Sequence, residues 1–119
     1  MTTHKILIAD DHPDIAETLA TLLEFFGHEV RCAFDGEQAM RMAEVFEPDV
    51  VILDINMPLA DGYQVARTLR ATRNGKQFII AMTGASHRET AQKAQDAGFN
   101  LHMTKPVSVE ALESILERI

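Results

Sequence analysis

Short apolar runs recur along the chain at intervals that predict strands. Four of them, residues 6–9, 50–53, 78–82 and 101–103, are mostly apolar without clean alternation, as expected of strands covered on both faces. A fifth run, residues 29–33, alternates polar with apolar side chains, which is typical of an edge strand with one solvated face. The pattern therefore predicts a sheet of five strands.

Between these runs, apolar side chains recur at the three- and four-residue spacing of amphipathic helices. The first stripe includes Ile15 and Leu22 and ends at Phe26, with Pro13 suited to the first helical turn and Gly27 to the stop. Three further stripes predict helices around residues 39–46, 65–69 and 109–119.

One more helix is predicted between the last two strands. The segment Ser86-His87-Arg88-Glu89 fits a capping box that opens it, and Gly98 is a suitable stop. Strands and helices then alternate in five β–α units, which implies a parallel sheet with right-handed crossovers and helices on both faces. A closed eight-stranded barrel needs roughly twice this length. The predicted fold class is therefore α/β with an open, doubly wound sheet.

Length and composition restrict the class of protein further. The chain has 119 residues, which suits one domain over residues 1–119. No apolar run approaches the roughly 20 residues that cross a bilayer, and the first residues lack a signal-peptide pattern, so we expect a cytoplasmic protein that does not bind membranes. A net charge of −7 disfavours direct binding to nucleic acid. The five histidines show no paired ligand spacing, so no zinc site is expected.

Polar residues follow directly after four of the predicted strands. They are Asp10-Asp11, Asp54, Thr83-Gly84 and Thr104-Lys105-Pro106. Ligands of open parallel sheets bind outside the carboxyl ends of the strands, so we expect these residues to meet at one edge. Converging carboxylates repel one another unless a cation compensates them, and Mg²⁺ or Mn²⁺ together with Lys105 meets that need. Asp54 can then act as a nucleophile in phosphoryl transfer.

At these residues the chain resembles the receiver domains of two-component response regulators, and the resemblance covers essentially the whole chain. The matching segments are Asp10-Asp11, residues 53–58 (Leu-Asp-Ile-Asn-Met-Pro), Asp61-Gly62, Thr83-Gly84 and Lys105-Pro106. Each segment is weak alone, but together, in this order and spacing, they form a specific signal. The resemblance implies a flavodoxin-like (βα)5 sheet in the order 2-1-3-4-5 and a role in phosphorelay signal transduction.

The resemblance implies which residues handle the phosphoryl group. Asp54 would accept it, Lys105 would pair with it, and Thr83 would report it through a hydrogen bond. The switch position three residues before Lys105, usually Tyr or Phe in the family, is His102 here. We therefore expect weaker coupling between Thr83 and this side chain than in the family.

A metal site is implied by the same resemblance. Asp11 and the side chain of Asp54 would bind the metal directly, Asn56 would contribute its backbone carbonyl, and Asp10 would act through a water molecule. Pro106 is expected to follow a cis peptide bond.

The resemblance also implies the kind of partner. A histidine kinase or a histidine phosphotransfer domain would donate the phosphoryl group, and a downstream effector would contact the face formed by the fourth helix, fifth strand and fifth helix. Residues 98–106 resemble receivers at the C-terminus of hybrid kinases, although a stand-alone receiver would have a similar sequence.

Two other functions are alternatives to this one. A metal-dependent phosphatase with an aspartyl nucleophile would carry a second acid two residues after the nucleophile, where this chain has Asn56. A flavodoxin-like cofactor binder would need a phosphate cradle after the first strand, where this chain has Asp10-Asp11. Turnover of phosphate esters would reveal the first alternative, and bound flavin colour the second.

Overall fold

The computed structural model describes residues 3–72, 75–84 and 88–119, in which five strands alternate with five helices. The strands are β1 (Lys5–Ala9), β2 (Glu29–Ala33), β3 (Val50–Asp54), β4 (Phe78–Thr83) and β5 (Leu101–Thr104). The helices are α1 (Pro13–Phe25), α2 (Gly36–Phe46), α3 (Gly62–Ala71), α4 (Arg88–Ala97) and α5 (Val109–Leu116). Each strand lies within a residue or so of its predicted position. The capping box predicted at Ser86 lies partly outside the described residues.

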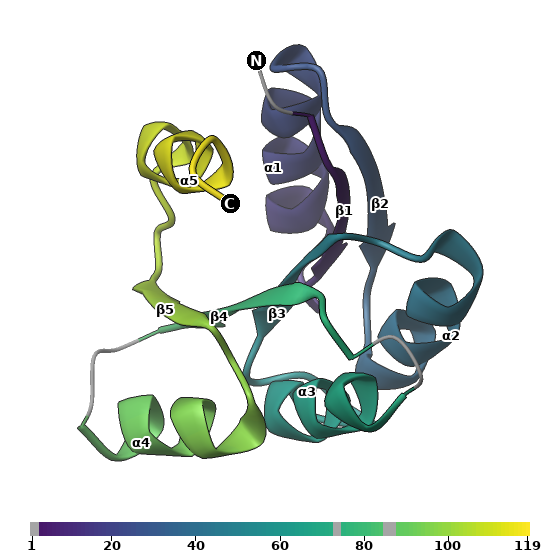
Figure 1. Ribbon diagram of the computed structural model, residues 1–119, viewed down its shortest axis with the longest axis vertical. Helices are drawn as coiled ribbons and strands as arrows, with labels where there is room; N and C mark the ends of the chain where they lie inside the picture. Colours follow the sequence, from purple (N-terminus) through teal and green to yellow (C-terminus); the bar gives the residue numbers. More distant parts are fainter. Residues whose placement is uncertain (1–2, 73–74, 85–87) are drawn as a thin grey trace.

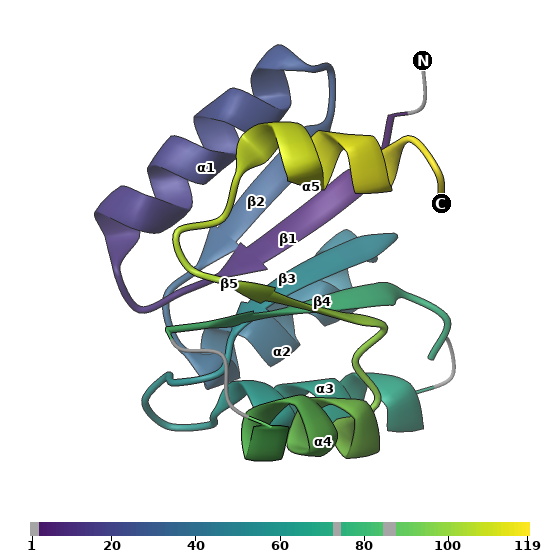
Figure 2. The same ribbon diagram turned by 90° about the vertical axis from the view of Figure 1, so that its left-hand side faces the viewer.

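All five strands are parallel and lie in the order β2-β1-β3-β4-β5, which confirms the predicted sheet. Helices α1 and α5 cover one face, and α2, α3 and α4 cover the other (Figures 1 and 2). Two apolar clusters fill the spaces between these layers, one on each side of the sheet. No helix among the described residues is long and apolar enough to cross a membrane.

Burial in two elements differs from the sequence pattern. In α1 the buried side chains include Ala16 and Ala20, whereas Ile15 is 47% and Leu22 is 42% exposed. Small alanines face the sheet because they let the helix approach closely, and two of the large apolar residues turn partly outward. Strand β5 was predicted to be covered on both faces but is half-buried, because it is an edge strand.

A buried polar contact attaches α5 to the opposite edge of the sheet. The ring of His28, which precedes β2, is fully buried, and its Nε2 lies 2.7 Å from Oε1 of Glu113 on α5. The His28 Nδ1 accepts a hydrogen bond from the backbone N–H of His4 at 3.0 Å. Because Nδ1 is an acceptor, Nε2 carries the hydrogen and donates a hydrogen bond to Oε1 of Glu113.

Candidate functional site at the carboxyl edge of the sheet

The two central strands bring two aspartates together at one edge of the sheet. Ala9 of β1 pairs with Leu53 of β3, so Asp10 and Asp54 follow side by side. Both side chains are buried, at 0% and 3% exposure. Carboxylates are rarely buried without a compensating charge. The fold therefore requires a positive group at this point.

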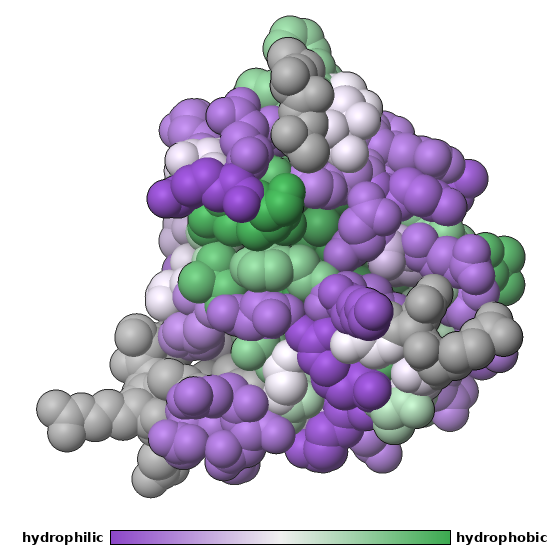
Figure 3. Space-filling view, in the orientation of Figure 1, coloured by the Kyte–Doolittle hydropathy of each residue, from purple (hydrophilic) through white to green (hydrophobic). Residues whose placement is uncertain are grey.

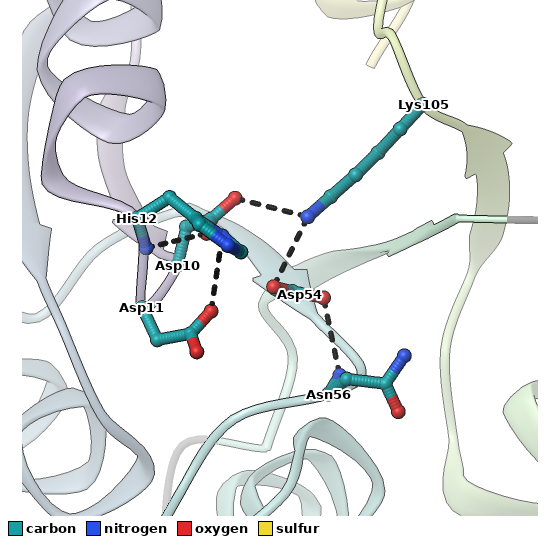
Figure 4. Close-up of polar contacts among 6 residues, drawn as sticks. All are labelled: Asp10, Asp11, His12, Asp54, Asn56 and Lys105. Atoms are coloured by element: carbon teal, nitrogen blue, oxygen red, sulfur yellow. Dashed lines mark hydrogen bonds and ion pairs between the residues drawn. The ribbon is translucent and has the colours of Figure 1, made fainter.

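Lys105 supplies that positive group from the loop after β5. Its Nζ lies 3.3 Å from Oδ2 of Asp10 and 3.1 Å from Oδ2 of Asp54 (Figure 4). Its backbone N–H donates to the carbonyl of Thr83 at 2.7 Å, and the bond to Pro106 is cis, as predicted. Burial alone would lower the pKa of Lys105, but its contacts with Asp54 and Asp10 outweigh burial and raise it. Lys105 is therefore held as a cation.

The local backbone fixes the second oxygen of Asp54. Oδ1 accepts a hydrogen bond from the N–H of Asn56 at 3.1 Å. Burial raises the pKa of Asp54 above its ordinary value, and Lys105 and the Asn56 N–H, which favour the ionised form, offset only part of that rise. The Asn56 side chain points away from the acidic residues (Figure 4). Asp54 thus holds a side chain of fixed orientation, nearly buried, at the carboxyl end of β3.

Gly62 explains why the motif Asp61-Gly62 accompanies this site. A Cβ atom at Gly62 would lie 2.6 Å from the backbone oxygen of Asp54 and 2.8 Å from the Cα of Ile55. The Gly62 N–H donates to the carbonyl of Ile55 at 2.9 Å. Only a residue without a side chain lets α3 begin this close to the strand end. The glycine therefore positions Asp54 without being part of its chemistry.

Asp11 and His12 complete a group of four potential metal ligands with Asp10 and Asp54. One ligand atom from each residue lies within 4.8 Å of the others. Asp10 Oδ2 and Asp11 Oδ1 are buried and meet no hydrogen-bond geometry among the described residues, although Lys105 Nζ lies 3.3 Å from the first and His12 Nδ1 3.2 Å from the second. Buried oxygens whose contacts are ion pairs alone, gathered in a group rich in carboxylates, suit a hard divalent cation. No sequence pattern pointed to His12, because its neighbours along the chain include no second histidine at ligand spacing.

Thr83 and His102 lie on the neighbouring strands of the same edge. Thr83, at the end of β4, is 3% exposed, and its Oγ1 lies 3.1 Å from Nε2 of half-buried His102 on β5. The two side chains are thus within hydrogen-bond distance, and the strength of their coupling stays a prediction. A histidine in place of Tyr or Phe keeps the link to Thr83 because its ring nitrogen can bond to the hydroxyl.

An apolar groove opens beside Lys105, between α1 and the segment that joins β5 to α5. Its apolar lining residues are Ile15, Leu19, Leu22, Met82, Pro106, Val107 and Val109. The apolar surface is visible between α1 and α5 in the space-filling view (Figure 3). A second hollow, between α2 and α3, lies at the other end of the strands, near Asp49 and Gln77.

Fold and site together define the class: a doubly wound α/β domain that carries a buried aspartate–lysine pair beside further acids, as phosphoacceptor signalling domains do. The family model described as "Response regulator receiver domain" matches residues 6–117. The chain belongs to this family and is a receiver domain of two-component signal transduction, a signalling module rather than an enzyme of metabolism. The phosphatase alternative is not favoured.

Several relatives resemble the chain along nearly its whole length. The transcriptional regulatory protein PdtaR of Mycobacterium tuberculosis is 36% identical over 114 residues, which cover 95% of this chain and 55% of the relative. The sensor protein EvgS of Escherichia coli is 34% identical over 115 residues, which cover 97% of this chain and 10% of the relative. The chain thus spans about half of the first relative and a small part of the second.

Solved structures agree with the assignment. The chemotaxis protein CheY4 of Vibrio cholerae superposes with a TM-score of 0.92 at 29% identity, covering 99% of both chains. The receiver domain of the sensor histidine kinase PA1611 of Pseudomonas aeruginosa, solved with a magnesium ion in its active-site cleft, gives 0.88 at 32% identity and covers 98% of this chain and 97% of that one.

Proposed function

We propose that Asp54 accepts a phosphoryl group and that this modification switches the conformation of the domain. The observation that carries the proposal is the buried pair of Asp54 and Lys105, whose Oδ2 and Nζ lie 3.1 Å apart at the carboxyl edge of the sheet. An ionised carboxylate that is fixed in orientation and paired with a cation has the properties of a nucleophile for phosphoryl transfer.

In the proposed reaction, an oxygen of Asp54 forms a bond to phosphorus while the bond between phosphorus and the donor's histidine nitrogen breaks. Lys105 then moves its pairing from the Asp54 carboxylate to an oxygen of the phosphoryl group, and the Thr83 hydroxyl donates to another oxygen. The domain catalyses only its own phosphorylation and dephosphorylation. Catalysis of this kind consists mainly of positioning and charge neutralisation.

A divalent cation, Mg²⁺ or Mn²⁺, is part of the proposal. Asp11 and Asp54 would hold it directly, Asn56 would contribute its backbone carbonyl, and Asp10 would act through a water molecule. When bound, the metal neutralises charge on the phosphoryl oxygens. The buried oxygens of Asp10 and Asp11, whose contacts among the described residues are ion pairs without hydrogen-bond geometry, support this assignment, as does the magnesium ion in the cleft of the PA1611 receiver domain.

The proposed donor is the phosphohistidine of a histidine kinase or a histidine phosphotransfer domain in the cytoplasm. The proposed output is an effector that contacts the face formed by α4, β5 and α5, next to the linked side chains of Thr83 and His102. A net charge of −7 argues against direct nucleic-acid binding by this domain. The names of the relatives, a transcriptional regulatory protein and a sensor protein, fit either a regulator or a hybrid kinase.

The phosphorylation site is tested by incubating the chain with acetyl phosphate and Mg²⁺ and measuring its intact mass. We expect one added phosphoryl group in the parent and in Asp14→Ala, which changes an exposed acid on α1. Asp54→Ala should lose stoichiometric labelling, because it removes the nucleophile. Full labelling of Asp54→Ala would contradict the proposal, whereas traces on a neighbouring acid would not.

The metal ligands are tested by calorimetry, since the chain contains no Trp for fluorescence. Asp11→Ala should lose most of its affinity for Mg²⁺, because a magnesium site has few protein ligands and each contributes strongly. Asp14→Ala is the matched control for loss of one negative charge nearby and should bind within about twofold of the parent, since exposed charges are well screened. Equal Mg²⁺ affinity in Asp11→Ala and the parent would refute the ligand role.

A further inference from the structure

The side chain of His12 does not cap the helix that begins after it. His12 is the N-cap residue of α1, where Ser, Thr, Asp or Asn commonly accepts a hydrogen bond from the first helical turn. The imidazole of His12 makes no such cap, and only its backbone carbonyl accepts from the N–H groups of Ile15 and Ala16. The ring is therefore available for another interaction.

The ring instead lies against the two acids that precede it. Nδ1 of His12 is 2.9 Å from Oδ1 of Asp10 and 3.2 Å from Oδ1 of Asp11 (Figure 4). The backbone N–H of His12 also donates to Oδ1 of Asp10 at 2.9 Å. Main chain and side chain thus hold the imidazole at the acids from the start of α1.

The His12 ring lies close enough to the carboxylate oxygens of the site to share a metal ion with them. A ring nitrogen of His12 belongs to the group in which one atom each of Asp10, Asp11, His12 and Asp54 lies within 4.8 Å of the rest. Two metal ligands about 2.1 Å from one ion are necessarily within about 4.2 Å of each other. Binding therefore requires a small inward movement of the ring and release to solvent of the proton through which Nδ1 contacts Asp10. The His12 side chain is 60% exposed, which leaves it room for that movement.

We propose that His12 is a nitrogen ligand of the divalent metal and shifts the preference of this site from Mg²⁺ towards transition metals. The inference rests on the proposed metal site and adds to it a residue that decides which metal is held. Mg²⁺ strongly prefers oxygen ligands, whereas imidazole nitrogen suits Co²⁺, Ni²⁺ and Zn²⁺. The carboxylates of the site provide affinity for Mg²⁺ and for transition metals alike. The imidazole of His12 adds affinity for transition metals.

The first test compares Mg²⁺ and Co²⁺ affinities of the 119-residue chain by calorimetry. His12→Ala should bind Co²⁺ about tenfold or more weakly than the parent, with Mg²⁺ affinity changed by less than about threefold, because only Co²⁺ gains from the nitrogen. His102→Ala removes a different imidazole near the same edge and should keep the Co²⁺ affinity. An equal loss for both metals, or no loss for Co²⁺, would overturn the proposal.

The second test detects the nitrogen itself. Pulsed electron paramagnetic resonance of the Mn²⁺-loaded chain should show coupling to an imidazole nitrogen in the parent and in His102→Ala, and none in His12→Ala. A parent that binds Mn²⁺ without nitrogen coupling would overturn the role of His12 while leaving the phosphoacceptor site intact. A parent that binds neither Mg²⁺ nor Mn²⁺ would overturn the proposed metal site and the role of His12 with it.

Discussion

At the scale of single residues, Leu59 stands out because its backbone is strained beside the site. Its φ is 71°, a conformation that L side chains rarely adopt, and its side chain is 72% exposed. The N–H of Ala60 donates to the carbonyl of Pro58 at 2.8 Å, which closes a three-residue turn around Leu59. That carbonyl also accepts from Gly36, whose Cβ, if present, would lie 1.8 Å from the backbone oxygen of Ala60. The loop that contains Leu59 therefore packs closely against the start of α2.

We predict that the domain tolerates glycine at this position better than alanine. Leu59→Gly should be more stable than Leu59→Ala by about 1 kcal/mol, because glycine adopts positive φ without strain while alanine keeps the Cβ atom. Little apolar burial is lost in either variant, since the side chain is mostly exposed. Urea unfolding followed by far-ultraviolet circular dichroism measures the difference. A glycine variant less stable than the alanine variant would mean that the turn is not strained.

At the scale of elements, the contact between His28 and Glu113 decides how α5 is attached. The two residues are 85 positions apart, and both side chains are buried, at 0% and 9% exposure. The carboxylate on α5 is the acceptor for the Nε2–H of His28, whose ring is fully enclosed. Removal of the carboxylate therefore leaves a buried donor without a partner.

Glu113→Ala should accordingly lower the free energy of unfolding by about 1–3 kcal/mol. Glu117→Ala, on the next turn of the same segment but exposed, should change it by less than about 0.5 kcal/mol. Chemical denaturation of the three proteins under one set of conditions gives the comparison. Similar losses in both variants would show that helix propensity, rather than the buried contact, governs the stability of α5.

At the scale of the whole molecule, the site is connected to the proposed output face through two adjacent strands. Thr83 at the end of β4 bonds to His102 on β5, and Lys105 follows that strand, with its N–H bonded to the carbonyl of Thr83. A phosphoryl group that attracts the Thr83 hydroxyl competes with His102 for it. Phosphorylation should therefore shift an existing equilibrium between two arrangements of this edge.

Amide chemical shifts of residues 101–119 with and without beryllofluoride, an analogue of the phosphoryl group, measure this response. We predict that Thr83→Ala abolishes most of the shift changes, because it removes the hydroxyl that exchanges partners. Thr83→Ser keeps the hydroxyl and should retain them, and His102→Ala should reduce them less than Thr83→Ala does. A full response in Thr83→Ala together with loss of response in His102→Ala would contradict this account of the switch.

Much of the fold and of the site is determined by the sequence itself. The apolar runs specify the strands because each strand must bury its side chains against helices, and the alternation of strand and helix leaves few topologies. Asp10, Asp54 and Lys105 could be placed together in advance, because the carboxyl ends of parallel strands meet at one edge. The resemblance supplied the strand order and the cis peptide bond before Pro106, both of which the structure confirms.

Only the tertiary structure decided the contacts that depend on how side chains turn. Periodicity could not show that Ala16 and Ala20 face the sheet in place of Ile15, because the depth of helix packing depends on the facing side chains. Arg70 of α3 donates to the carbonyl of Gly98 at 2.9 Å, and His28 to Glu113, across separations that no local pattern encodes. The imidazole of His12 likewise joins the acidic group because a rotamer points it there, and rotamers follow from the packed structure rather than from residue type.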